Sequence, residues 1–165
     1  MGLTLILSLA GCALLLLTIW IATVTMPFRA LAGFFPQDVQ ERLKPRLDAQ
    51  KMTGNRIAGM VLTVLLLLGY VLLFVTGGID GLHHGFRFGQ FFLRFFIMTA
   101  VIKLFDIVCL DYILLTKTQF FQHYLPETAG CAGWKQFGYN RKQQLRQCIS
   151  LPVFSLIGAL IFSRL

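Results

Sequence analysis

The chain has 165 residues, of which 56% are hydrophobic and only 13% are charged. This composition excludes an ordinary soluble domain, and several apolar runs approach the roughly 20 residues that span a bilayer. The net charge of +8 arises from basic residues gathered between those runs, without the aromatic pattern of a nucleic-acid-binding module. We therefore expect an all-α, polytopic integral membrane protein whose partner is the lipid bilayer and not nucleic acid.

The first apolar run, residues 3–26, has the length of a full span and is closed by Pro27 and Arg29. Within it, the stretch LAGC, which ends at Cys12, resembles a lipoprotein cleavage box. No basic residue precedes the run, and apolar sequence continues well past the cysteine, which favours an intact transmembrane helix. Whether Cys12 is a processing site stays open.

The connection 27–56 is polar and basic, and its segment FFPQDVQERLKP predicts a short helix that starts at Pro36 and stops at Pro45. Two interpretations of this helix stay open. It lies on the membrane surface as an amphipathic helix, or it belongs to a binding loop for an anionic headgroup or a partner protein.

A second span is predicted at residues 57–75, where Tyr70 carries the only ionisable group. We expect the glycine-rich segment 76–81 to break this helix, and a short loop to lead into the next span. That loop contains His83 and His84, whose side chains point in different directions on any regular backbone. They are interpreted as loop residues, with a metal or proton-sensing role as the alternative.

The third predicted span, residues 91–115, carries Lys103, Asp106 and Asp111. An ionisable side chain at mid-membrane costs roughly 2.5–3.5 kcal/mol, so it normally faces protein or water and has a partner. Lys103 and Asp106 lie one helical turn apart and are predicted to pair within the helix. Asp111 then needs a partner elsewhere. The pair either holds a bundle in register or belongs to an ion or proton pathway.

The segment 116–145 is the longest polar region, and Pro126 with three glycines makes its middle irregular. Residues 140–147 are predicted to form a short basic helix at the lipid surface. The last span is predicted at residues 146–163 and is short for a bilayer. Its Ser155 and Ala159 form a small-residue face that suits contact with another helix.

Most lysines and arginines lie in the connections 27–56 and 116–145. The positive-inside tendency therefore predicts that both connections are cytoplasmic and that both termini lie outside the cell membrane. The four cysteines show no CxxC spacing, so reduced thiols are expected. Residues 1–165 are expected to form a single membrane domain, a bundle of four transmembrane helices.

A second group of candidate residues lies in the inner half of the third span, at Asp106 and Asp111, and in the loop that follows it, at His123, Glu127 and Cys131. These residue types ligate metals or exchange protons. The chain lacks an HExxH motif, a phosphate-binding glycine loop and a nucleophile elbow. The structural alternative is that Asp111 binds basic loop residues, and that His123 and Glu127 are surface groups.

Residues 105–144, FDIVCLDYILLTKTQFFQHYLPETAGCAGWKQFGYNRKQQ, resemble a group of uncharacterised small bacterial four-helix membrane proteins. The resemblance implies a membrane bundle and carries no activity. The stretch QERLKPRLD is superficially similar to the polar loop of glutathione- and eicosanoid-handling membrane enzymes, whose arginine, asparagine and histidine pattern is missing.

These observations predict a transport component or an accessory subunit. Four helices enclose little interior, so burial of Lys103 and Asp106 is expected to involve a homo-oligomer or a larger membrane partner. The alternative is a membrane-embedded enzyme with an interfacial site at Asp111, His123 and Glu127, acting on a lipid-like substrate. The sequence does not set the substrate, any cofactor or metal, or the direction of transport.

Overall fold

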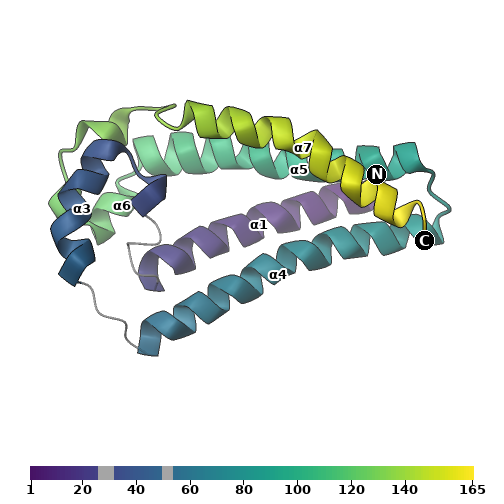
Figure 1. Ribbon diagram of the computed structural model, residues 1–165, viewed down its shortest axis with the longest axis horizontal. Coiled ribbons are helices and arrows are strands. Elements are labelled where there is room, and N and C mark those ends of the chain that lie inside the picture. Colours follow the sequence, from purple (N-terminus) through teal and green to yellow (C-terminus); the bar gives the residue numbers. More distant parts are fainter. Residues whose placement is uncertain (26–31, 50–53) are drawn as a thin grey trace. The chain divides into compact units, whose positions relative to one another are not determined.

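A computed structural model describes residues 1–25, 32–49 and 54–165, and all regular structure in this part of the chain is helical (Figure 1). Six α-helices are present there, together with a π-helix, η2, and three short 3-10 helices. In chain order the elements are α1 (Gly2–Thr25), η1 (Ala32–Phe34), α3 (Gln37–Ala49), α4 (Gly54–His83), α5 (Phe88–Phe105), η2 (Asp106–Lys117), α6 (Phe120–Tyr124), η3 (Pro126–Thr128), η4 (Ala132–Lys135) and α7 (Arg141–Phe162).

Within the described residues, three helices are long and apolar enough to cross a membrane: Gly2–Thr25, Ile57–His83 and Arg141–Phe162. These candidate transmembrane helices indicate a multi-pass membrane protein. The predicted closure of the first span at Pro27 and Arg29 lies outside the described residues. The predicted third span, residues 91–115, is helical but consists of two elements, α5 and η2, and it is not among the three.

The prediction that residues 76–81 break the second span is wrong, because α4 continues to His83. The glycines of this segment lie where large side chains approach the helix. A Cβ atom added at Gly77 would lie 3.3 Å from Leu7 Cδ1, and one added at Gly81 would overlap Phe91 Cε1. Here glycine permits close helix packing, and the surrounding contacts outweigh its low helix propensity.

Helix α3 begins at Gln37, directly after Pro36 as predicted, but its end and the start of the last helix differ from the predictions. Helix α3 runs through Pro45 to Ala49, so Pro45 does not stop it. The last helix begins at Arg141, five residues before the predicted start, and therefore includes the basic segment that was predicted as a separate surface helix. Pro152 lies in the interior of α7. The longer helix removes the apparent shortness of the last span.

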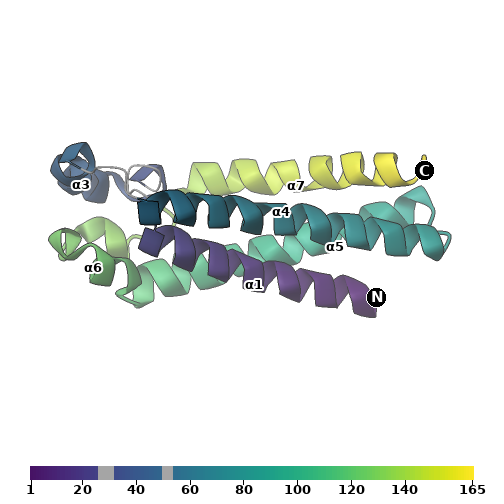
Figure 2. The same ribbon diagram turned by 90° about the horizontal axis from the view of Figure 1, so that it is seen from below.

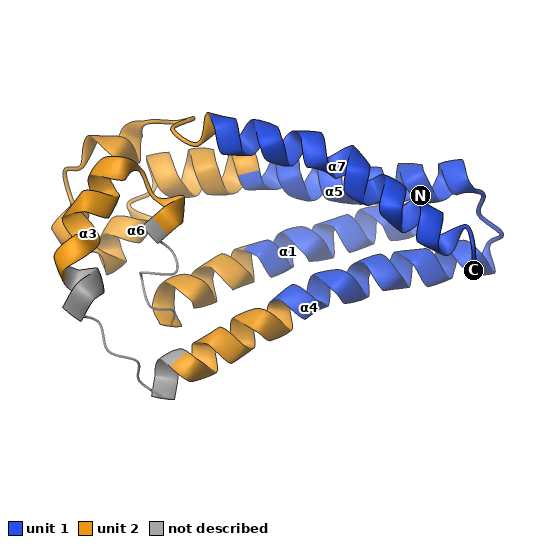
Figure 3. Ribbon diagram, in the orientation of Figure 1, with its two compact units in different colours: residues 1–15, 67–106, 142–165 blue, residues 16–66, 107–141 orange. Residues whose placement is uncertain are grey.

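The chain divides into two compact units, which Figure 3 shows in different colours. Unit 1 comprises residues 1–15, 67–106 and 142–165. Its core consists of apolar side chains from α1, α5 and α7, namely Leu7, Phe91, Phe95, Met98 and Ala159. The predicted small-residue face of α7 is buried in this unit, since Ser155 is 1% exposed and Ala159 is fully buried.

Unit 2 comprises residues 16–66 and 107–141 and joins the two polar connections. In it α3 packs against the segment that holds α6, η3 and η4 (Figures 1 and 2). Its core consists of Phe35, Val39, Leu43, Leu115, Leu125, Cys131 and Trp134. The apolar face of α3 is therefore covered by protein, because Val39 and Leu43 are fully buried. This finding replaces the interpretation of α3 as a surface helix whose apolar face meets lipid.

We predict that Gly81→Ala lowers the thermal unfolding temperature in detergent. The added methyl group would collide with Phe91, which is fully buried and so has little room to move. Overpacking of this kind costs about 1–3 kcal/mol. Gly89→Ala on α5 is the matched control, since nothing lies within 4 Å of its added Cβ atom and alanine favours a helix. A Gly81→Ala protein as stable as the parent would contradict the packing role.

Candidate functional site

Lys103, near the end of α5, lies at the centre of a polar cluster in unit 1. Its ammonium nitrogen is 2.5 Å from Asp106 Oδ2 and 2.5 Å from Gln147 Oε1. The first contact is the one-turn ion pair that the sequence predicts, and the second joins α5 to α7. The Lys103 side chain is 10% exposed and that of Asp106 is 25% exposed. An ammonium donates three hydrogen bonds, and two are used here.

A smaller polar contact lies one turn before this cluster. Thr99 Oγ1 and Ser155 Oγ are 3.4 Å apart, again between α5 and α7. Each hydroxyl also donates to a backbone carbonyl of its own helix, Thr99 to Phe95 and Ser155 to Leu151. The α5–α7 contact therefore contains hydroxyl, amide, ammonium and carboxylate groups between apolar helices. Ionisable groups in such an environment mark ion or proton pathways, or fix helix register.

Within a single chain Lys103 is buried, with 8% of its surface exposed, whereas the side chain of Asp106 stays 25% exposed. Gln147 contributes to the burial of Lys103, because it comes from α7 of the same chain and accepts a hydrogen bond from the ammonium. The predicted last span, residues 146–163, contains Gln147 in its first turn, but no pattern in the sequence indicates that Gln147 faces Lys103. Burial of Lys103 therefore does not by itself require a second chain, and the homo-oligomer or larger membrane partner stays a prediction.

The sequence analysis did not identify a second buried ion pair, between Arg94 of α5 and Asp80 of α4. Arg94 Nη1 donates to Asp80 Oδ2 at 2.6 Å and to the carbonyl of Gly77 at 2.7 Å. The carbon of the guanidinium group lies 4.3 Å from the centroid of the Phe86 ring. The Arg94 side chain is 5% exposed. This arrangement fixes the turn between α4 and α5 through both charge and cation–π contact.

The carboxylate of Asp80 also contacts a histidine. His84 Nδ1 lies 3.4 Å from Asp80 Oδ1 and 2.8 Å from the Asp80 carbonyl oxygen. A signal for the Arg94–Asp80 pair is present in the sequence, because Asp80 and Arg94 carry opposite charges on either side of the same short turn. It was missed because Asp80 was assigned to a loop, where a carboxylate needs no partner.

Asp111, His123, Glu127 and Cys131 have separate surroundings. Asp111 Oδ2 accepts a hydrogen bond from Asn140 Nδ2 at 3.2 Å. His123 is exposed on α6, with its ring against Tyr124. Glu127 is half-buried on η3. Cys131 is buried in the apolar core of unit 2, where its sulfur lies 4.0 Å from the carbonyl oxygen of Asp38.

No group of three or more histidine, cysteine, aspartate or glutamate side chains in the described residues is placed to hold a metal ion. The buried thiol of Cys131 serves packing, since it lies in the same core as Trp134. Asp38, which the sequence analysis did not single out, joins the two connections: its Oδ2 accepts a hydrogen bond from the backbone N–H of Gly133 at 2.8 Å. The polar residues of unit 2 thus include a structural link that sequence spacing did not indicate.

We predict that Lys103→Met and Asp106→Leu each destabilise the protein more than their combination does. Either single change leaves one charge buried without its partner, at a cost of about 3–5 kcal/mol, whereas removal of both charges is closer to neutral. Thermal unfolding in detergent of the parent, both single variants and the double variant measures the coupling. Lys142→Met, at an exposed lysine in the first turn of α7, is the control and should be neutral. Additive single effects would show that the pair makes no energetic contact.

Comparisons with known proteins found no matching family model, no matching curated protein and no matching solved structure.

Proposed function

We propose that the chain is a bundle of four transmembrane helices in the cell membrane, with both termini outside and the connections 27–56 and 116–145 on the cytoplasmic side. The three candidate spans support a multi-pass arrangement. The fourth span in this proposal is α5 with η2, which together form the long helical segment between α4 and the second connection. Its charges Arg94 and Lys103 have acidic partners, which lowers the cost of placing it in a membrane.

Within this arrangement the chain acts as a transport component or an accessory subunit. The observation that carries the proposal is the Lys103–Asp106–Gln147 cluster between apolar helices. Ionisable residues in membrane helices are costly and usually functional. Association with a second copy or a larger membrane partner is part of the proposal. The spans of α4 and α7, each only 11% buried within the chain, leave apolar surface that such a partner would cover.

The alternative, an interfacial enzyme that acts on a lipid-like substrate, receives less support. Its three residues have surroundings of different kinds: Asp111 binds Asn140, His123 is exposed and Glu127 is half-buried. A general acid or base must lie within hydrogen-bond reach of the reacting group, which such different surroundings do not favour.

The orientation predicts the outcome of cysteine labelling. In a background without Cys12, Cys109, Cys131 and Cys148, we place single cysteines at His83 and Gln136, which are both exposed. An impermeant maleimide added to intact cells should modify the first position and not the second. Modification of Gln136→Cys from outside would reverse the orientation, and modification of both positions from one side would contradict a spanning α5 and η2.

The functional proposal predicts that the Lys103→Met/Asp106→Leu double variant folds but loses activity. Native mass spectrometry of the chain purified from its own membranes should show an oligomer or a bound membrane protein, or proteoliposomes should show ion flux. The double variant should reduce whichever signal the parent gives, because the charges act in function beyond folding. A monomeric parent without flux, carrying a metal that His123→Ala removes, would favour the enzyme.

A further inference from the structure

The π-helix η2 places Lys117 over the ring of Tyr112. Residues five apart on an α-helix differ by about 140° around the axis and do not meet. The i→i+5 hydrogen bonds of a π-helix bring such residues to the same side, and Thr118 N donates to Ile113 O at 2.9 Å in this pattern. The Lys117 ammonium consequently lies 5.2 Å from the Tyr112 ring centroid.

Phe137, from the loop after η4, completes an exposed cluster in unit 2. Its ring meets Tyr112 edge to face, with centroids 5.5 Å apart and an interplanar angle of 84°. The rings of Tyr112 and Phe137 are nevertheless 42% and 56% exposed. The hydrogen bond from Asn140 to Asp111 holds the same loop against η2. The cluster is therefore fixed in place by its supports while its rings and ammonium remain accessible.

The charge of Lys117 has no acidic partner in the described part of the chain, since none of the ion pairs there includes it. Two exposed rings beside a lysine are suited to the boundary between lipid and water, where aromatic side chains anchor proteins. Lysines near an anionic leaflet gain about 1 kcal/mol each from headgroup charge. The complementary group is thus an anion that also carries apolar surface.

We propose that Tyr112, Lys117 and Phe137 bind the headgroup region of an anionic phospholipid. Lys117 contacts the lipid phosphate, and the two rings contact the glycerol backbone and the first carbons of the acyl chains. This inference rests on the proposed function, in which the C-terminal end of η2 reaches the cytoplasmic membrane surface. A soluble phosphate ion would use the ammonium but would leave both rings without a contact, so a lipid is the better match.

The test measures binding of phosphatidylglycerol and phosphatidylcholine to the full-length chain, stripped of lipid in detergent, by native mass spectrometry. The parent should prefer the anionic lipid. Lys117→Gln should raise the Kd for phosphatidylglycerol about fivefold, the equivalent of about 1 kcal/mol. Lys117→Arg should retain the parent affinity because the positive charge stays. Tyr112→Leu and Phe137→Leu should each weaken binding through loss of a ring.

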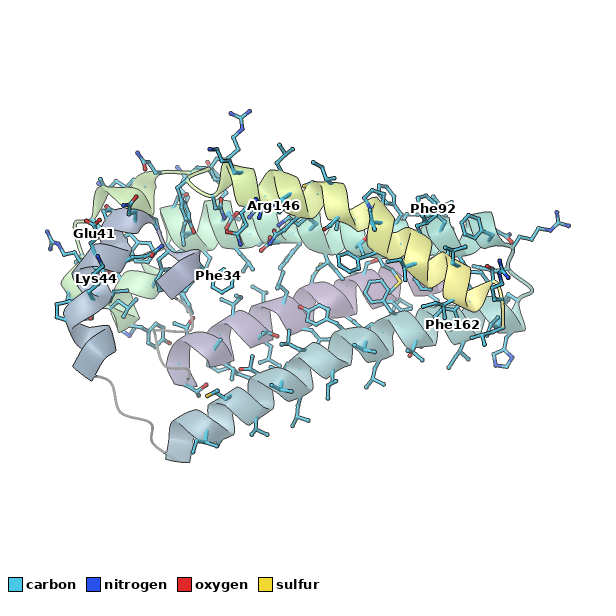
Figure 4. All side chains as sticks on the ribbon, in the orientation of Figure 1. Phe34, Glu41, Lys44, Phe92, Arg146 and Phe162 are labelled. Carbon is cyan, nitrogen blue, oxygen red and sulfur yellow. The ribbon has the colours of Figure 1, made fainter. Side chains whose placement is uncertain are left out.

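Lys44→Gln is the matched control, because Lys44 is an exposed lysine on α3 in the same unit (Figure 4). An equal loss with Lys44→Gln would overturn the site in favour of diffuse charge attraction. Equal affinity for the two lipids would overturn it as well, and displacement by inorganic phosphate at equal concentration would assign the site to a soluble anion. Unfolding temperatures establish that the variants are folded. The readout involves neither flux nor a partner protein, so it fails or succeeds separately from the proposed function.

Discussion

The cost of burying charge in an apolar helix constrains unit 1 more than any other interaction. Helix α5 carries Arg94 and Lys103, and each meets an acidic group together with a neutral acceptor on another helix. Arg94 binds Asp80 and the Gly77 carbonyl of α4, while Lys103 binds Asp106 and Gln147 of α7. Because both acceptors must lie within hydrogen-bond reach, the two bases set the positions of α4 and α7 along α5.

The positions of α4 and α7 along α5 also determine the apolar packing in unit 1. Gly77, a hydrogen-bond acceptor for Arg94, is also a point of close approach for Leu7 and Met98. A Cβ atom at Gly78 would overlap the ring of Phe162, which closes α7 beside α4 (Figure 4). Glycine thus allows the α4 backbone to come near enough for both the ion pair and the aromatic core. Charge pairing and packing are two consequences of one close helix contact.

Local patterns in the sequence predicted the features that depend on neighbouring residues alone. Long apolar runs gave the three candidate spans, and a spacing of three residues gave the Lys103–Asp106 pair. The errors involve residues whose role depends on distant partners. The glycines at 77, 78 and 81 look like a loop until Phe91 and Phe162 are placed beside them. Likewise, Val39 and Leu43 look lipid-facing until Trp134 and Leu125, about 90 residues later, cover them. Neither case can be decided from spacing within one segment.

The candidate interfacial residues also show that sequence spacing does not predict which side chains share a site. Asp111, His123, Glu127 and Cys131 follow one another closely in sequence, yet η2, α6 and η3 give each a different surrounding. The helix changes from α to π geometry at Asp106, and no pattern in the sequence predicted this change. It rotates every later side chain of that segment relative to an α-helix, so Lys117 reaches Tyr112. The helix type therefore decides which groups of this segment act together, and sequence spacing alone assigns them to the wrong faces.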